Sequence, residues 1–176
     1  MYYKIFFNII LILLVAIFQI SFVNNLPLYF NQINIFLLIL IFILSLTNFE
    51  YIAWWSIGIG LILDIFSFYF FGVYLVSYFL TILLINYLYK NYFTDRSLYS
   101  FSILIVISII FYEFIIKTFY YLLFLINSKE VFFLVSEIFW FNLFSELIIN
   151  LLAMSILFYI FSLLSEKLKP VFLIKK

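Results

Sequence analysis

The sequence predicts an all-α, polytopic membrane protein with a single domain, residues 1–176. Three observations carry this prediction. Of the residues, 69% are hydrophobic and 10% are charged, whereas soluble domains average about 45–50% apolar and about 25% charged residues. The mean hydropathy is +1.33, so the chain has more apolar surface than a water-soluble fold of this size could bury. Polar clusters also divide the chain into apolar runs that approach the length of a spanning helix, about 20 residues.

Six apolar runs are candidate membrane spans, and charged or amide side chains separate most of them. We place the spans at residues 5–23, 33–47, 51–70, 73–89, 98–121 and 142–164. The apolar stretch 131–164 is too long for one span at about 1.5 Å per residue. We therefore expect a short interfacial helix over Val131–Phe141, followed by the sixth span.

Positive charges predict the orientation of these spans, because cytoplasmic loops carry an excess of Lys and Arg. With six spans, Lys4, the connection 90–96 and the basic C-terminal tail all fall on one side of the membrane. We therefore expect both termini in the cytoplasm. Five spans would place the basic tail outside the cell, and this count is the alternative.

The composition argues against an enzyme, a metal site and a nucleic-acid-binding protein. The chain has no Cys and no His, so it lacks thiolate and imidazole ligands and the commonest general base. Its sequence contains no phosphate-binding Gly-rich motif and no metalloprotease motif. The net charge of +1 provides no basic surface for nucleic acid. We expect no catalytic residue, no cofactor and no metal.

Asp64 lies deep in the third predicted span, where a charged side chain costs about 2.5–3.5 kcal/mol. Gly60 precedes it by four residues and shares its helix face, which permits close approach of a second helix. These residue types favour a packing role, in which Asp64 caps a broken helix. A contact with a partner and a direct chemical role are the alternatives.

Two further polar groups lie inside predicted spans. Glu113 and Lys117 are four residues apart, in the order that favours an ion pair on one helix face. Asn142, Glu146 and Asn150 recur every four residues and form a polar stripe on the sixth span. We expect a self-neutralised pair and a stripe that joins helices, with a substrate pathway as the alternative. The aromatic residues are expected to provide bulk for packing and lipid contact.

The segment around Asp64 resembles the motif of the MreD family of rod shape-determining membrane proteins. The family pattern G-x-x-x-D-x-x-S corresponds to Gly60, Asp64 and Ser67, and Gly72 follows where the family has a later glycine. Asn34, thirty residues before Asp64, matches the polar residue that opens a family span.

The resemblance covers residues 19–88 well and the rest of the chain loosely. Gln19 stands where the family often has Gln before its outer loop, and Asn86-Tyr87-Leu88 is similar to the family's G-Y-L sequence. The chain departs from the pattern at Phe68, where the family has Gly, and at Ile33, where it has Pro.

The resemblance implies a non-enzymatic scaffold of the cell-elongation and cell-wall synthesis machinery in the bacterial inner membrane. Its implied partners are an MreC-like single-span protein and, through that complex, an MreB-like filament, RodA and a class B transpeptidase, besides membrane lipid. The implied determinants of helix geometry and partner binding are Gly60, Asp64, Ser67, Gly72 and Asn34.

The MreD fold is similar to the six-helix substrate-binding subunit of energy-coupling-factor transporters, so fold alone does not separate the two functions. A vitamin-binding subunit of that kind is the alternative. It would offer polar outer loops and a small-residue face on its first span for docking the energising subunit. Here the outer loops are short, and the first span offers Ala16 and Ser21, which favours the scaffold.

Overall fold

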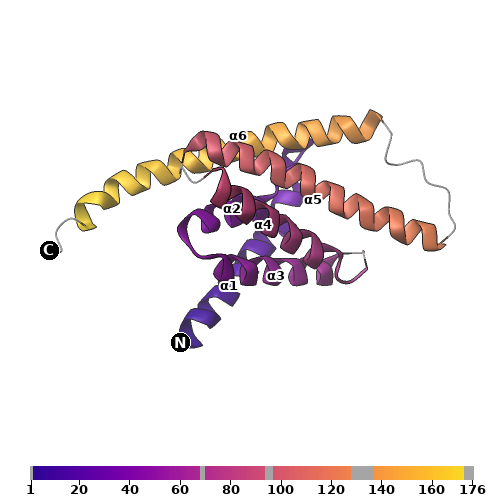
Figure 1. The fold of residues 1–176 in the computed structure, drawn as a ribbon, viewed down its shortest axis with the longest axis horizontal. Coiled ribbons are helices and arrows are strands. Elements are labelled where there is room, and N and C mark those ends of the chain that lie inside the picture. Colours follow the sequence, from indigo (N-terminus) through magenta and orange to yellow (C-terminus); the bar gives the residue numbers. More distant parts are fainter. Residues whose placement is uncertain (1, 68–69, 94–96, 128–136, 173–176) are drawn as a thin grey trace.

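The computed structural model describes residues 2–67, 70–93, 97–127 and 137–172, and every regular element in these ranges is helical (Figure 1). This confirms the predicted all-α class. The elements are, in order, α1 (Tyr2–Ser21), η1 (Val23–Asn25), η2 (Leu28–Gln32), α2 (Ile35–Leu46), α3 (Phe49–Phe66), α4 (Val73–Asn91), α5 (Leu98–Asn127) and α6 (Glu137–Phe172), where η denotes a 3₁₀ helix.

Five of the described helices, α1, α3, α4, α5 and α6, are long and apolar enough to cross a membrane. The chain is therefore a multi-pass membrane protein. The helix α2 is shorter than the predicted span 33–47, and its 12 residues rise about 18 Å against a hydrocarbon core of about 30 Å. The helix is short because Asn34 caps its start by accepting a hydrogen bond from the Leu37 N–H, and the chain becomes extended at Thr47.

Although α2 is short, it runs back along α1. At its start, the Ile35 N–H donates to Gln19 Oε1 (3.1 Å) near the end of α1. Beyond its end, the Tyr51 hydroxyl donates to Asn8 Oδ1 (2.8 Å) near the beginning of α1. The helix α2 therefore runs antiparallel to the part of α1 between Asn8 and Gln19.

The last two helices are longer than predicted. The helix α5 continues past residue 121 to Asn127, and α6 is continuous from Glu137 to Phe172. Their 30 and 36 residues rise about 45 and about 54 Å, so both extend beyond a hydrocarbon core. The expected boundary between Val131–Phe141 and the span 142–164 does not exist within α6, since no Gly or Pro interrupts residues 137–169. Residues 131–136 lie outside the described residues.

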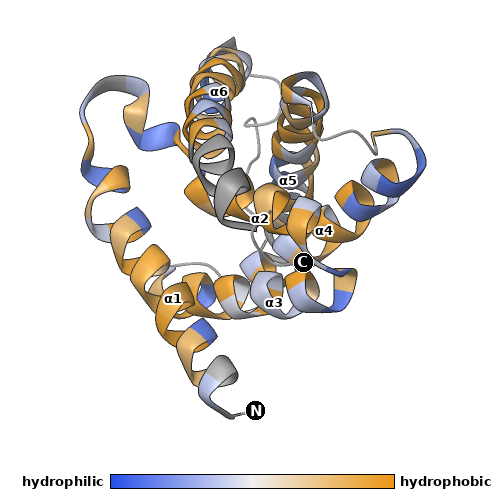
Figure 2. Ribbon diagram, turned by 90° about the vertical axis from the view of Figure 1, so that its left-hand side faces the viewer, coloured by the Kyte–Doolittle hydropathy of each residue, from blue (hydrophilic) through white to orange (hydrophobic). Residues whose placement is uncertain are grey.

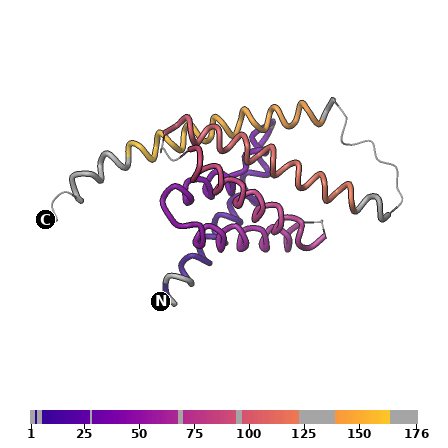
Figure 3. Tube along the Cα trace, viewed as in Figure 1, coloured from indigo at the N-terminus to yellow at the C-terminus, as the bar shows by residue number. Residues whose placement is uncertain are grey.

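The helices pack around α2. Figure 3 shows α3 and α4 as an antiparallel pair, with α5 beside α4 and with α6 crossing α5. Figure 2 shows α1 and α6 on either side of α2, with polar colouring in the loop that joins α1 to α2. The core centres on α2 and draws buried residues from every other helix, such as Ala16, Ile59, Ile82, Leu104 and Met154.

Candidate functional site

The motif residues build the turn between α3 and α4. Gly72 is the N-cap of α4 and has no side chain to accept a hydrogen bond from the first N–H groups of that helix. The Asp64 carboxylate takes this role: Oδ1 accepts from the Tyr74 N–H (2.9 Å) and Oδ2 from the Leu75 N–H (3.1 Å). Asp64 is 4% exposed and lies at the positive end of the α4 dipole. Such an acceptor is needed because lipid offers none.

Gly60, Gly72 and Ser67 complete this turn. A Cβ on Gly60 would overlap the Leu75 Cα, so the backbones of α3 and α4 come this close because residue 60 is Gly. Gly72 has a φ of 103°, in the left-handed region that favours glycine. The Ser67 hydroxyl donates to the Asp64 carbonyl oxygen (3.2 Å). The four motif residues thus form one structural unit, in which Asp64 and Gly60 face α4.

A set of amides fixes the start of α2. Asn150, fully buried on α6, accepts from the Asn34 N–H (2.8 Å) and donates to the Gln32 carbonyl oxygen (3.0 Å). Asn34 Oδ1 accepts from the Leu37 N–H (3.2 Å) and from the Tyr78 hydroxyl (3.0 Å). These bonds join the beginning of α2 to α4 and α6.

Gln19 holds the other side of the same loop. Its Nε2 donates to the Ile33 carbonyl oxygen (2.8 Å) and to Asn24 Oδ1 (3.0 Å), while its Oε1 accepts from the Ile35 N–H. The connection between α1 and α2 is thereby tied to α1 by Gln19 and to α6 by Asn150. Irregular backbone at membrane depth is tolerated where its polar groups are paired in this way.

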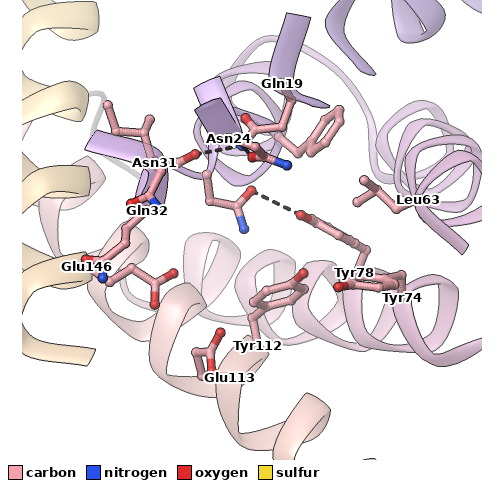
Figure 4. A pocket seen from close by; sticks show the side chains of 13 residues that line it. Gln19, Asn24, Asn31, Gln32, Leu63, Tyr74, Tyr78, Tyr112, Glu113 and Glu146 are labelled. Atoms are coloured by element: carbon pink, nitrogen blue, oxygen red, sulfur yellow. Dashed lines mark hydrogen bonds between the residues drawn. The ribbon is translucent and has the colours of Figure 1, made fainter. Parts of the chain in front are cut away.

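Of these amides, Gln19, Asn24, Gln32 and Asn34 line one wall of a polar pocket among the helices (Figure 4). The pocket has a volume of about 290 Å³ and opens to the outside. Every helix contributes to its lining, as does the loop between α1 and α2. The lining residues are Gln19, Asn24, Asn31, Gln32, Ile33, Asn34, Phe36, Leu63, Tyr74, Tyr78, Tyr112, Glu113 and Glu146.

The pocket brings together two carboxylates from different helices, Glu113 of α5 and Glu146 of α6, and its described lining holds no basic residue. Figure 4 shows both side chains directed toward the space beside Tyr112. The predicted pair exists: Lys117 Nζ lies 3.9 Å from Glu113 Oε2, and both side chains are partly exposed. Glu146 lies within electrostatic range of Glu113 and Lys117. Asp64 is not among the lining residues.

The predicted polar stripe on α6 divides into three environments. Asn150 is buried and joins α6 to the start of α2. Glu146 faces the polar pocket, and Asn142 is exposed. One helix face thus contains a structural residue, a pocket residue and a surface residue.

Sequence reasoning missed the pocket tyrosines Tyr74, Tyr78 and Tyr112 by treating aromatic residues as bulk. The rings of Tyr78 and Tyr112 lie 4.8 Å apart, and both are buried. The available signal was the hydroxyl group, because a Tyr deep in a span needs a hydrogen-bond partner. Tyr74 and Tyr78 are also one helical turn apart, and Tyr112 directly precedes Glu113.

A second, apolar groove lies between α1 and α6. It has a volume of about 700 Å³ and opens to the surface of the bundle. Residues of α2, together with Ile33 before it, line the groove between the two longer helices. The lining residues are Leu14, Val15, Phe18, Ile33, Ile35, Leu38, Ile39, Ala153, Ile156 and Leu157.

Comparison of the chain with protein-family models, with curated proteins and with solved structures finds no match. Three features of the molecule itself therefore bear on its function. These are the capped α3–α4 turn, the apolar groove and the polar pocket.

Proposed function

We propose that this protein is a non-enzymatic scaffold of the cell-elongation and cell-wall synthesis machinery, which maintains rod shape by binding an MreC-like single-span partner in the bacterial cell membrane. The observation that carries the proposal is the apolar groove between α1 and α6. The MreD-like motif supports it, because Gly60, Asp64, Ser67 and Gly72 act together in one turn. Through the partner, the complex would include an MreB-like filament, RodA and a class B transpeptidase.

The groove suits a single transmembrane helix. All ten lining residues are apolar, and Ala153 is small enough to permit close approach of a second backbone. A docked helix would cover Leu14 and Ile156, which are 57% and 60% exposed. Helices associate in lipid through packing of this kind, since lipid tails are as apolar as the side chains.

Site-specific cross-linking in native membranes tests this proposal. A photoreactive residue at Leu14 or Ile156 is expected to capture an MreC-like single-span protein, with wall synthases recovered by mass spectrometry. Phe114 on α5, which is 67% exposed and lies outside the groove, is the matched control. Equal capture of the same protein from position 114, or its absence from positions 14 and 156, would contradict docking in the groove.

The polar pocket favours a second candidate, the substrate-binding membrane subunit of an energy-coupling-factor vitamin transporter. Pockets with a few convergent polar groups are typical of small-molecule sites. The same purification separates the two functions, because a transporter subunit would be recovered with paired ATPases and a coupling membrane subunit. Recovery of those proteins without wall synthases would replace the scaffold by the transporter.

A further inference from the structure

We propose that the polar pocket binds a small organic ammonium ion. The pocket and the apolar groove share only Ile33, so this inference does not depend on partner docking. The inference uses the same pocket as the second candidate function. If the protein is a transporter subunit, the inference adds that its substrate carries a positive charge. Charge, aromatic lining and size each contribute to the argument.

The charge of the pocket favours a cation. Glu113 and Glu146 reach the same space from two helices, and Lys117 Nζ lies 3.9 Å from Glu113 Oε2 and also near the rings of Tyr120 and Phe139. Two carboxylates and one ammonium group leave a formal charge of −1. A carboxylate inside a helix bundle is costly unless it takes up a proton or a positive group accompanies it. A bound cation would provide that group.

The aromatic lining favours an organic cation. The rings of Tyr74, Tyr78 and Tyr112 line the side of the pocket that faces the two glutamates (Figure 4). Aromatic faces attract ammonium groups, and more strongly when the ammonium group is desolvated. Within the described residues, no group of three or more Asp and Glu side chains lies together in a metal-binding arrangement.

The amides of the pocket are largely engaged, which leaves the carboxylates as the recognition groups. Gln32 Oε1 accepts from the Ser145 hydroxyl (2.7 Å), and Asn34 Oδ1 accepts two hydrogen bonds. Gln19 is bonded through both of its polar atoms. The volume of about 290 Å³ lies just below the range of about 300–1,000 Å³ for ligand sites, so the ligand is small.

Calorimetry on the purified full chain tests the charge requirement. The protein is placed in nanodiscs of phosphatidylglycerol, whose headgroup has no ammonium, and titrated with choline or ethanolamine. The neutral control is 3,3-dimethyl-1-butanol, which has the shape of choline without its charge. We expect saturable binding of at least one ammonium ion and binding at least tenfold weaker for the neutral alcohol. Equal binding of both would overturn the proposal.

Variants test the residues. Glu146→Gln keeps the side-chain shape and is expected to weaken ammonium binding at least tenfold, whereas Glu50→Gln, at an exposed position on α3, is expected to leave it unchanged. Should Glu146→Gln fail to fold, Tyr112→Phe and Tyr112→Leu give a second comparison. The ring of Phe is expected to preserve binding, and Leu to weaken it. Binding that is unchanged in Glu146→Gln, or in Tyr112→Leu, would overturn the proposal.

The ammonium group could belong to a free amine or to a lipid headgroup, and native mass spectrometry distinguishes these sources. Nanodiscs that also contain phosphatidylethanolamine are used for the wild type and Glu146→Gln. Preferential retention of this lipid by the wild type, with displacement by ethanolamine, assigns the headgroup. Binding of free amine without lipid retention assigns a soluble ligand, and absence of both overturns the proposal. Cross-linking from Leu14 is expected to persist in Glu146→Gln, so the two proposals fail separately.

Discussion

At the scale of the residue, Asp64 shows how a charged side chain is accommodated in an apolar helix. Its two oxygens accept hydrogen bonds from two successive N–H groups of α4, for which the N-cap residue Gly72 has no side-chain acceptor. Its burial and its nearby glycine were readable from the sequence, and so was a capping role. The identity of the two donors was not, because they lie ten and eleven residues later, beyond a turn whose geometry depends on Gly72.

Removing the Asp64 carboxylate is expected to destabilise the protein. Asp64→Leu leaves the N–H groups of Tyr74 and Leu75 without their acceptors, at about 1–3 kcal/mol for each unsatisfied group. Asp64→Asn retains one acceptor oxygen, so we expect a smaller loss. Thermal unfolding of the purified variants in detergent measures both, with Glu50→Gln as the control. A wild-type midpoint for Asp64→Leu would show that the cap contributes nothing.

The glycines of α3 provide a matched pair. Gly60→Ala would force a Cβ into the backbone of Leu75, and overpacking of this kind costs about 1–3 kcal/mol. At Gly58 a Cβ would meet the tip of the Ile12 side chain at 3.1 Å, which can move aside. We expect Gly60→Ala to lower the unfolding midpoint and Gly58→Ala to change it little. Similar midpoints for both variants would contradict the close α3–α4 contact.

At the scale of the element, the apolar runs located all six helices but did not determine their lengths. The helix α2 is short because the residues before it form the 3₁₀ helix Leu28–Gln32 and Asn34 caps its start. The helix α6 is long because nothing in residues 137–141 stops a helix. Spacing also placed Asn142, Glu146 and Asn150 on one face. It did not reveal which of them contacts a neighbour, since that depends on how far α2 and α5 extend beside α6.

The difference between these amides on α6 is testable. Asn150→Leu removes the bonds to the Asn34 N–H and the Gln32 carbonyl, and hydrogen bonds between membrane helices contribute about 0.6 kcal/mol each on average, with a maximum of about 1.7. Asn142→Leu makes the same chemical change at an exposed position. We expect the first variant alone to lower stability, measured by reversible unfolding in mixed micelles. Equal losses of stability in the two variants would show that Asn150 does not join α6 to the start of α2.

At the scale of the whole molecule, the convergence of Glu113 and Glu146 could not be read from the sequence. The two residues are on different helices, and their meeting depends on how α5 and α6 pack. The composition, by contrast, predicted a membrane protein, because the hydrophobic and charged fractions are averages over the whole chain and do not depend on how the helices pack. The tyrosines of the pocket fall between these cases. The sequence indicated that each hydroxyl group needs a hydrogen-bond partner, but not that the three residues line one pocket.

The orientation predicted from Lys and Arg is a property of the whole chain. Reporter domains fused to either terminus are expected to be active in the cytoplasm if six segments cross the membrane. Short as it is, α2 must then count as one crossing. Opposite signals from the two fusions would mean that α2 does not carry the chain across and that five segments do. A fusion in the loop between α1 and α2, expected outside, serves as the internal control.

The hydrogen bonds described above also set an order for biosynthesis. In the turn between α3 and α4, the N–H groups of Tyr74 and Leu75 donate to Asp64, which is synthesised ten and eleven residues earlier. This helix pair therefore needs no later part of the chain to pair these donors. The start of α2 does need one, because Asn34 receives its acceptor from Asn150, 116 residues later. At synthesis rates of about 5–20 residues per second, that interval is about 6–23 seconds. During it, the Asn34 N–H lacks the Asn150 acceptor, and the arrival of α6 completes the hydrogen bonds at the start of α2.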